Sequence, residues 1–91
     1  METLELRYNN FKAFCQKMQP DNELVKMLQI TPLGTFLQTI QIRQKQNSST
    51  TEIRKMILEK GQIDEEKVDK ADLEKFDRYI QYFNDVISTL E

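Results

Sequence analysis

An apolar stripe near the C-terminal end limits the folds open to this chain. Its members recur at alternating steps of three and four residues: Leu73, Phe76, Ile80, Phe83, Ile87 and Leu90. Because an α-helix turns once every ~3.6 residues, this spacing places the whole stripe on one helix face, close to a heptad seam. A helix this apolar packs against another element, so we predict a helix from about Lys70 to Thr89 that contributes to a core.

The N-terminal segment has the same kind of pattern. We predict a helix from Glu2 to Met18, and its apolar face consists of Leu4, Tyr8, Phe11, Phe14, Cys15 and Met18. Pro20 ends this helix, because its ring disfavours helical geometry in the preceding residue. A short second helix is expected through Ile30, capped by Asp21 or Asn22.

The Thr31-Pro32 pair predicts the start of a third helix, which continues to about Gln46. Thr31 is a suitable cap, and proline is tolerated at the first helical position because that position needs no N–H donor. A proline kink within one longer helix is the alternative.

A fourth helix is predicted after the polar loop. Ser49 followed by Glu52 matches a capping box, which marks its start. Gly61 lies just past its end, where a left-handed residue is expected. Asp64 is a candidate cap for the next turn, and Val68 marks a short lead-in to the final helix.

The sequence therefore predicts an all-α fold, a compact bundle of four to five helices with long N- and C-terminal helices packed near-antiparallel. Its 91 residues form a single helical domain, residues 1–91. Residues 90–91 also match a cloning scar, an alternative in which Leu90 does not belong to the stripe.

The absence of histidine excludes several kinds of site. Histidine is the commonest general base and metal ligand, so di-iron bundles based on Glu-x-x-His and cysteine–histidine nucleophile pairs are excluded. We interpret the lone cysteine, Cys15, as a small core residue, with a reactive thiol as the alternative. We expect no enzyme, no catalytic residue, no cofactor and no metal.

An acidic cluster precedes and begins the last predicted helix: Asp64, Glu65, Glu66, Asp69, Asp72 and Glu74. Its spacing does not match a calcium-binding loop, and the central glycine of such a loop is missing. We interpret these side chains as a solvated helix start that complements the helix dipole.

The last predicted helix is more apolar than one neighbour requires. At about 100° per residue its apolar positions cover roughly 180°, whereas one packing partner needs about 100°. The surplus comprises Tyr79, Tyr82 and Val86. Two neighbours within the bundle would cover them; alternatively, they form an intermolecular contact, for which tyrosine is well suited.

The alternative of an intermolecular contact leads to our functional hypothesis. The chain would be a small non-enzymatic interaction module such as an adaptor, inhibitor or assembly factor. Its interface would comprise Tyr79, Tyr82, Phe83 and Val86. The partner would be another protein or a second copy of the chain in a homodimer.

The alternative hypothesis is a nucleic-acid accessory protein. Its contacts would be Arg43, Lys45, Arg54 and Lys55, which flank the polar loop. The net charge of −2 and the lack of interleaved aromatic residues weigh against this alternative. We also expect no membrane partner and a cytoplasmic location, because the chain has one cysteine and its apolar residues alternate with charges.

Overall fold

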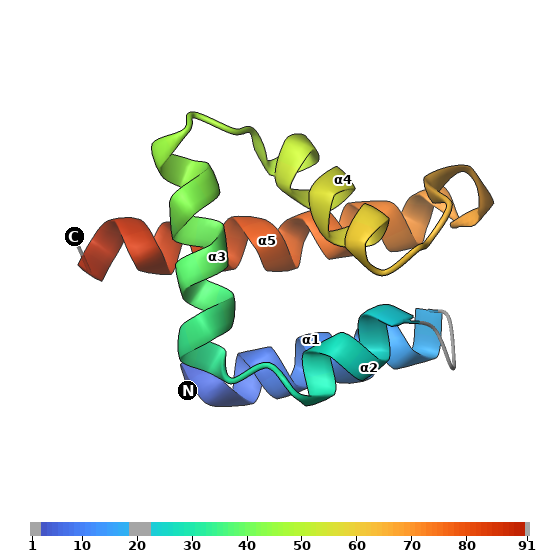
Figure 1. Ribbon diagram of the computed structural model, residues 1–91, viewed down its shortest axis with the longest axis horizontal. Coiled ribbons are helices and arrows are strands. Elements are labelled where there is room, and N and C mark those ends of the chain that lie inside the picture. The colour runs from blue at the N-terminus through green and yellow to red at the C-terminus, as the bar shows by residue number, and fades with distance from the viewer. Residues whose placement is uncertain (1–2, 19–22, 91) are drawn as a thin grey trace.

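The computed structural model describes residues 3–18 and 23–90. These residues form five α-helices and one short 3₁₀ helix, in the order α1 (Leu4–Met18), α2 (Glu23–Gln29), α3 (Leu33–Lys45), α4 (Thr50–Lys60), η1 (Glu65–Lys67) and α5 (Lys70–Leu90) (Figure 1). The predicted all-α bundle is confirmed. The predicted roles of Pro20, Asp21 and Asn22 lie outside the described residues, as does the predicted first helical residue, Glu2.

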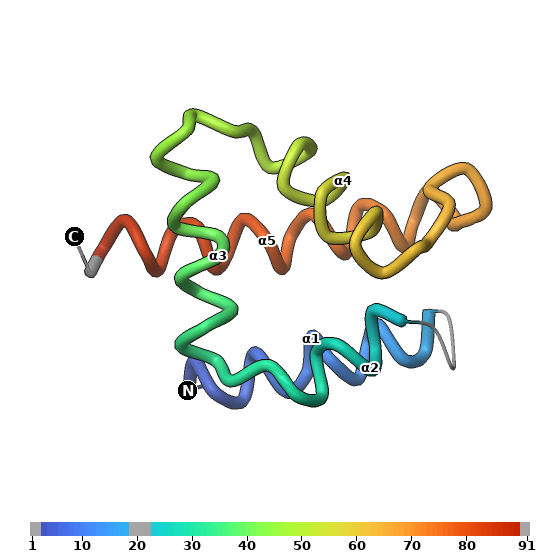
Figure 2. The backbone as a smooth tube through the Cα atoms, in the orientation of Figure 1, coloured from blue at the N-terminus to red at the C-terminus, as the bar shows by residue number. Residues whose placement is uncertain are grey.

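The longest helix, α5, organises the bundle. It packs against α1, α3 and α4, while α2 packs against α1 and α4. The backbone trace shows α1 and α5 running in opposite directions and α3 crossing α5 steeply (Figure 2). The near-antiparallel arrangement of α1 and α5 was predicted, but α3 and α4 contact α5 more extensively than α1 does.

The predicted stripe of α5 forms the centre of the core. Phe76, Ile80, Phe83 and Ile87 are buried, and Leu73 is half-buried. Around them lies a group of phenylalanines from three helices whose neighbouring ring centroids are 5.2 to 5.9 Å apart: Phe11, Phe36, Phe76 and Phe83. Tilted and edge-to-face pairs of this kind add about 0.5–1.5 kcal/mol each beyond the burial of apolar area.

The chain breaks, rather than kinks, between α2 and α3. Pro32 is the N-cap of α3 and no side chain caps this helix. The prediction that Thr31 caps α3 is wrong, because its hydroxyl donates instead to the carbonyl oxygen of Met27, 2.6 Å away, in the preceding helix. The Tyr8 hydroxyl donates to the Thr31 carbonyl oxygen at 2.7 Å, which ties this connection to α1.

The predicted start of α4 is confirmed, and Gly61 lies just past its end as predicted, but the prediction that Gly61 is left-handed is wrong. Ser49 and Glu52 form both hydrogen bonds of a capping box. Gly61, however, has a φ of −84°, and the left-handed residue is the next one, Gln62, with a φ of 58°. Glycine is needed at position 61 for space, since a Cβ there would lie 3.0 Å from the Cα of Leu24.

The segment between α4 and α5 follows the predicted pattern. Asp64 caps η1 by accepting a hydrogen bond of 3.0 Å from the backbone N–H of Glu66. The 3₁₀ turn then ends at Val68, just before α5 begins.

Candidate functional site

Tyr79 and Tyr82, the two tyrosines beyond the arc that one packing neighbour needs, contact α1 of the same chain. The ring centroid of Tyr79 lies 5.4 Å from that of Phe11 and 5.7 Å from that of Phe14, against which it is stacked. Tyr79 is half-buried as a result. A second neighbour within the bundle therefore accounts for much of the apolar surface of this residue.

Tyr82 is also covered from α1. The guanidinium carbon of Arg7 lies 4.3 Å from the centroid of its ring, in a cation–π contact. Val86, one turn further along α5, is half-buried. Phe83 is fully buried in the core. Our assignment of Phe83 to an intermolecular surface is therefore corrected: it has no surface to offer a partner.

The four basic residues that the nucleic-acid hypothesis names do not form one exposed cationic surface. Lys45 and Lys55 are exposed and Arg43 is half-buried. Arg54 has a side chain that is only 12% exposed, and its guanidinium pairs with Asp77 at 2.6 Å and Glu65 at 2.5 Å. Arg54 thus joins α4 to α5 and η1, which corrects its assignment as a phosphate contact.

The ion pair also affects the titration of Asp77. Burial raises the pKa of its carboxyl above the ordinary value, while the positive charge and hydrogen bond of Arg54 oppose this effect. Asp77 lies on the side of α5 that faces α4, so it serves the fold rather than an open site.

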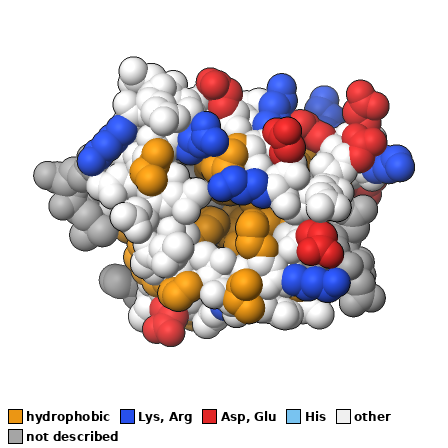
Figure 3. All heavy atoms as spheres, in the orientation of Figure 1, with side chains coloured by type: hydrophobic (Ala, Val, Ile, Leu, Met, Phe, Trp, Pro, Cys, Tyr) orange, Lys and Arg blue, Asp and Glu red, His pale blue; other side chains and the backbone are white. Residues whose placement is uncertain are grey.

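A pocket of about 130 Å³ opens between α2, α3 and α4. Its apolar lining consists of Met27, Leu28, Phe36, Ile40, Met56 and Ile57. Hydrophobic side chains gather in the hollowed middle of this face of the molecule (Figure 3). We call this feature the α2–α3–α4 pocket.

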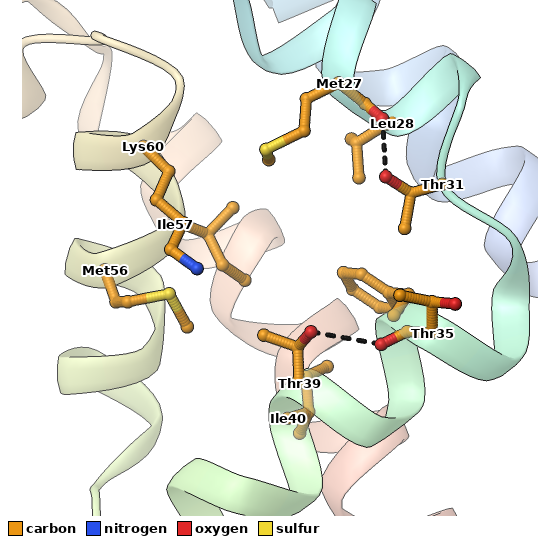
Figure 4. A pocket seen from close by; sticks show the side chains of 10 residues that line it. Met27, Leu28, Thr31, Thr35, Thr39, Ile40, Met56, Ile57 and Lys60 are labelled. Carbon is orange, nitrogen blue, oxygen red and sulfur yellow. Dashed lines mark hydrogen bonds between the residues drawn. The ribbon is translucent and has the colours of Figure 1, made fainter.

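Three threonines and one lysine complete the lining of the α2–α3–α4 pocket: Thr31, Thr35, Thr39 and Lys60. The hydroxyl of Thr39 donates to the carbonyl oxygen of Thr35 at 3.0 Å, so its proton is already used, as is that of Thr31 (Figure 4). The amine of Lys60 lies beside Ile57 on the side of α4 that faces the pocket (Figure 4). The pocket is therefore apolar with one cation at its rim.

Our reasoning from the sequence missed the α2–α3–α4 pocket, although the chain carries a signal for it. Thr31, Thr35 and Thr39 recur at intervals of four, which places them along one side of α3 and its N-terminal connection. Small side chains in such a row leave space where larger ones would fill it. Ile42, one turn beyond Thr39, is 53% exposed and extends the apolar character of α3 outwards.

Cys15 is a core residue, as predicted, since it has no exposed surface. Burial raises the pKa of its thiol to about 12. Among residues 3–18 and 23–90, no three histidine, cysteine, aspartate or glutamate side chains come together as a possible metal site. Within the same residues, no helix has the length and apolar character needed to span a membrane.

Comparison of the chain with models of protein families, with curated proteins and with solved structures gives no match.

Proposed function

We propose that this chain is a small, non-enzymatic interaction module that binds a partner protein through the α2–α3–α4 pocket. The observation that carries the proposal is the pocket itself, an apolar space of about 130 Å³ on an accessible face. Protein interfaces draw most of their binding energy from a few anchor side chains that fill pockets of this kind. The proposal keeps the functional class expected from the sequence and moves its working surface away from Phe83.

The size of the α2–α3–α4 pocket suits one large apolar side chain. An apolar cavity of ~150 Å³ is known to accommodate a benzene molecule, so 130 Å³ is suitable for a single phenyl or branched aliphatic group. Met27 and Met56 are both half-buried at this pocket. Because methionine side chains are flexible and polarisable, they can adjust to the shape of the inserted group.

The charge at the rim indicates the chemistry beside that anchor. Lys60 is exposed and has no ion pair in the described part of the chain. A carboxylate of the partner, placed near the apolar anchor, would pair with it. We therefore expect a partner segment in which an aromatic or branched residue is followed or preceded closely by aspartate or glutamate.

Selection of peptides from a random display library tests this proposal. We expect enriched sequences to combine a large apolar residue with a nearby acid. Thr35→Arg, at the exposed edge of the pocket, should weaken their binding at least about tenfold by blocking the pocket. Gln38→Arg, an exposed substitution on the same helix outside the pocket, is the matched control and should change affinity by less than about twofold.

Two results would count against the proposal: selection that enriches no peptide, or peptides whose binding is equally insensitive to both substitutions. Sedimentation mass across a concentration series addresses the homodimer. If the mass rises with concentration and Thr35→Arg abolishes the rise, the partner is a second copy of this chain.

We also propose a cytoplasmic location for this function. The support is the single cysteine of the sequence, which the fold holds as a free, buried thiol. Such use of cysteine is typical of proteins in reducing compartments.

A further inference from the structure

A second hollow, between α1 and α5, has a cationic lining. It has a volume of about 190 Å³ and is lined by Arg7 from α1 and by Lys75, Arg78 and Tyr79 from α5. None of these four residues lines the α2–α3–α4 pocket. We call this feature the α1–α5 hollow.

Aromatic rings position two of the three cations. The guanidinium of Arg7 lies 4.3 Å from the centroid of the Tyr82 ring, and the amine of Lys75 lies 5.2 Å from the centroid of the Phe14 ring. Phe14 is in turn stacked on Tyr79, with 5.7 Å between ring centroids. Contacts of this kind restrict long side chains before a ligand arrives, so less conformational entropy is lost on binding.

No acidic residue of α5 lines the α1–α5 hollow. Asp77 is paired with Arg54 on the side that faces α4. Asp72 lines a neighbouring hollow beside Lys75. Within the described residues neither Lys75 nor Arg78 forms an ion pair, and the lining of the α1–α5 hollow contains no carboxylate.

We propose that the α1–α5 hollow binds the dianionic group of a phosphate monoester. Lys75 and Arg78, which have no ion pair among the described residues, lie beside Arg7 of α1 and suit a group that presents three terminal oxygens and close to two negative charges. Arginine is suited to such a group because its planar guanidinium donates two parallel hydrogen bonds. Tyr79 adds a hydroxyl that has no hydrogen-bond partner among the described residues.

A short ligand fits this site better than a nucleic-acid strand. The segment 64–74, which leads into α5 and forms its first turns, has six acidic and two basic residues, and its net negative charge would repel a phosphate backbone that continued beyond the α1–α5 hollow towards it. A phosphodiester also carries a single charge per phosphate, so the cations of the hollow would attract it less strongly than they attract a monoester.

Titration of the full chain with phenyl phosphate, followed by calorimetry and by amide chemical shifts, tests the proposal. We expect saturable binding, with the largest shifts around Arg7, Lys75, Arg78 and Tyr79. Inorganic phosphate should bind at the same residues, and the singly charged diester methyl phenyl phosphate should bind about tenfold more weakly. Single-stranded DNA should give no tighter binding than the diester.

Substitutions then locate the binding. Lys75→Gln and Arg78→Gln should each weaken binding of phenyl phosphate about tenfold, and Tyr79→Phe about threefold, since phenylalanine keeps the ring and removes only the hydroxyl. Lys45→Gln and Lys55→Gln remove exposed cations elsewhere and should leave affinity within about twofold. Thermal unfolding of each variant shows whether it keeps its fold.

The proposal is overturned if binding does not saturate at millimolar phenyl phosphate, or if the Lys45 and Lys55 controls weaken it as much as Lys75→Gln and Arg78→Gln do. Tighter binding of DNA than of the monoester would also overturn it, and would instead assign the α1–α5 hollow to nucleic acid.

Discussion

Leu24 packs directly against Gly61, at the point where α4 ends. A Cβ at position 61 would lie 3.0 Å from the Cα of Leu24 and closer still to its Cβ. Leu24 itself has no exposed surface and is held by the core on its other sides. The glycine therefore lets α2 approach α4, and this approach brings together two of the three helices that enclose the α2–α3–α4 pocket.

Gly61→Ala should destabilise the protein. The alanine Cβ forces α2 away from α4, and overpacking of this kind typically costs about 1–3 kcal/mol of unfolding free energy. The φ of −84° is accessible to alanine, so the cost comes from crowding and not from backbone strain. Urea unfolding followed by circular dichroism measures the change.

Gly34→Ala is the matched control for this substitution. Gly34 lies exposed in α3, and a Cβ there meets no atom within 4 Å. Because alanine favours helix over glycine, we expect an increase in unfolding free energy of roughly 0.5–1 kcal/mol. Equal effects of the two substitutions would contradict the role given to Leu24.

Asp77 should make the protein less stable as the pH rises from acid. Burial raises its folded-state pKa above the ordinary 3.8, against the opposing effect of Arg54. The folded state then holds this proton more tightly than the unfolded state does. The contribution of Asp77 to folding stability is thus fully present below its pKa in the unfolded state. It is lost as the pH rises through its pKa in the folded state.

Unfolding free energies of the wild type and Asp77→Asn, measured from pH 3 to pH 7, check this sign. The unfolding free energy of the wild type minus that of Asp77→Asn should decrease as the pH rises. Asp85→Asn, an exposed site on the same helix, controls for the loss of one negative charge. A difference that grows with pH would show that attraction to Arg54 outweighs the cost of burial.

The thiol of Cys15 should be inert in the folded protein. Its pKa of about 12, together with complete burial, leaves very little accessible thiolate at pH 8. We expect labelling by a disulfide reagent to be at least about a hundredfold slower than in concentrated urea. Glutathione under the same conditions gives the rate of an exposed thiol, and a native rate close to it would show that the helices packed against α1 do not cover Cys15.

The helices and their local signals were predictable from the sequence because they depend on near neighbours. The stripe of α5 follows from the helical repeat alone, and Ser49 and Glu52 lie three positions apart within one capping box. At Thr31 and Gly61 a second local arrangement replaces the expected one. The Thr31 hydroxyl bonds back to the preceding helix instead of capping the next one, and the left-handed conformation falls one residue later than expected, at Gln62.

The candidate sites were less predictable, because they depend on which helices become neighbours. The width of the apolar arc on α5 showed that Tyr79 and Tyr82 required a second packing partner. It did not show that this partner would be α1, through Phe11, Phe14 and Arg7. Arg54 looked like an exposed cation because Asp77 is 23 positions away in the sequence. The row of threonines on α3 does not show which helices lie opposite it, and the α1–α5 hollow combines residues of two helices, so neither pocket was found.

The position of α5 has a consequence for synthesis. This helix packs on apolar faces of α1, α3 and α4. In a nascent chain that has emerged only as far as η1, those faces are therefore exposed to solvent. The earlier helices cannot complete a stable core one after another as they leave the ribosome, so folding should occur late and in one step. Until α5 emerges, the chain should be a substrate for chaperones that recognise exposed apolar segments.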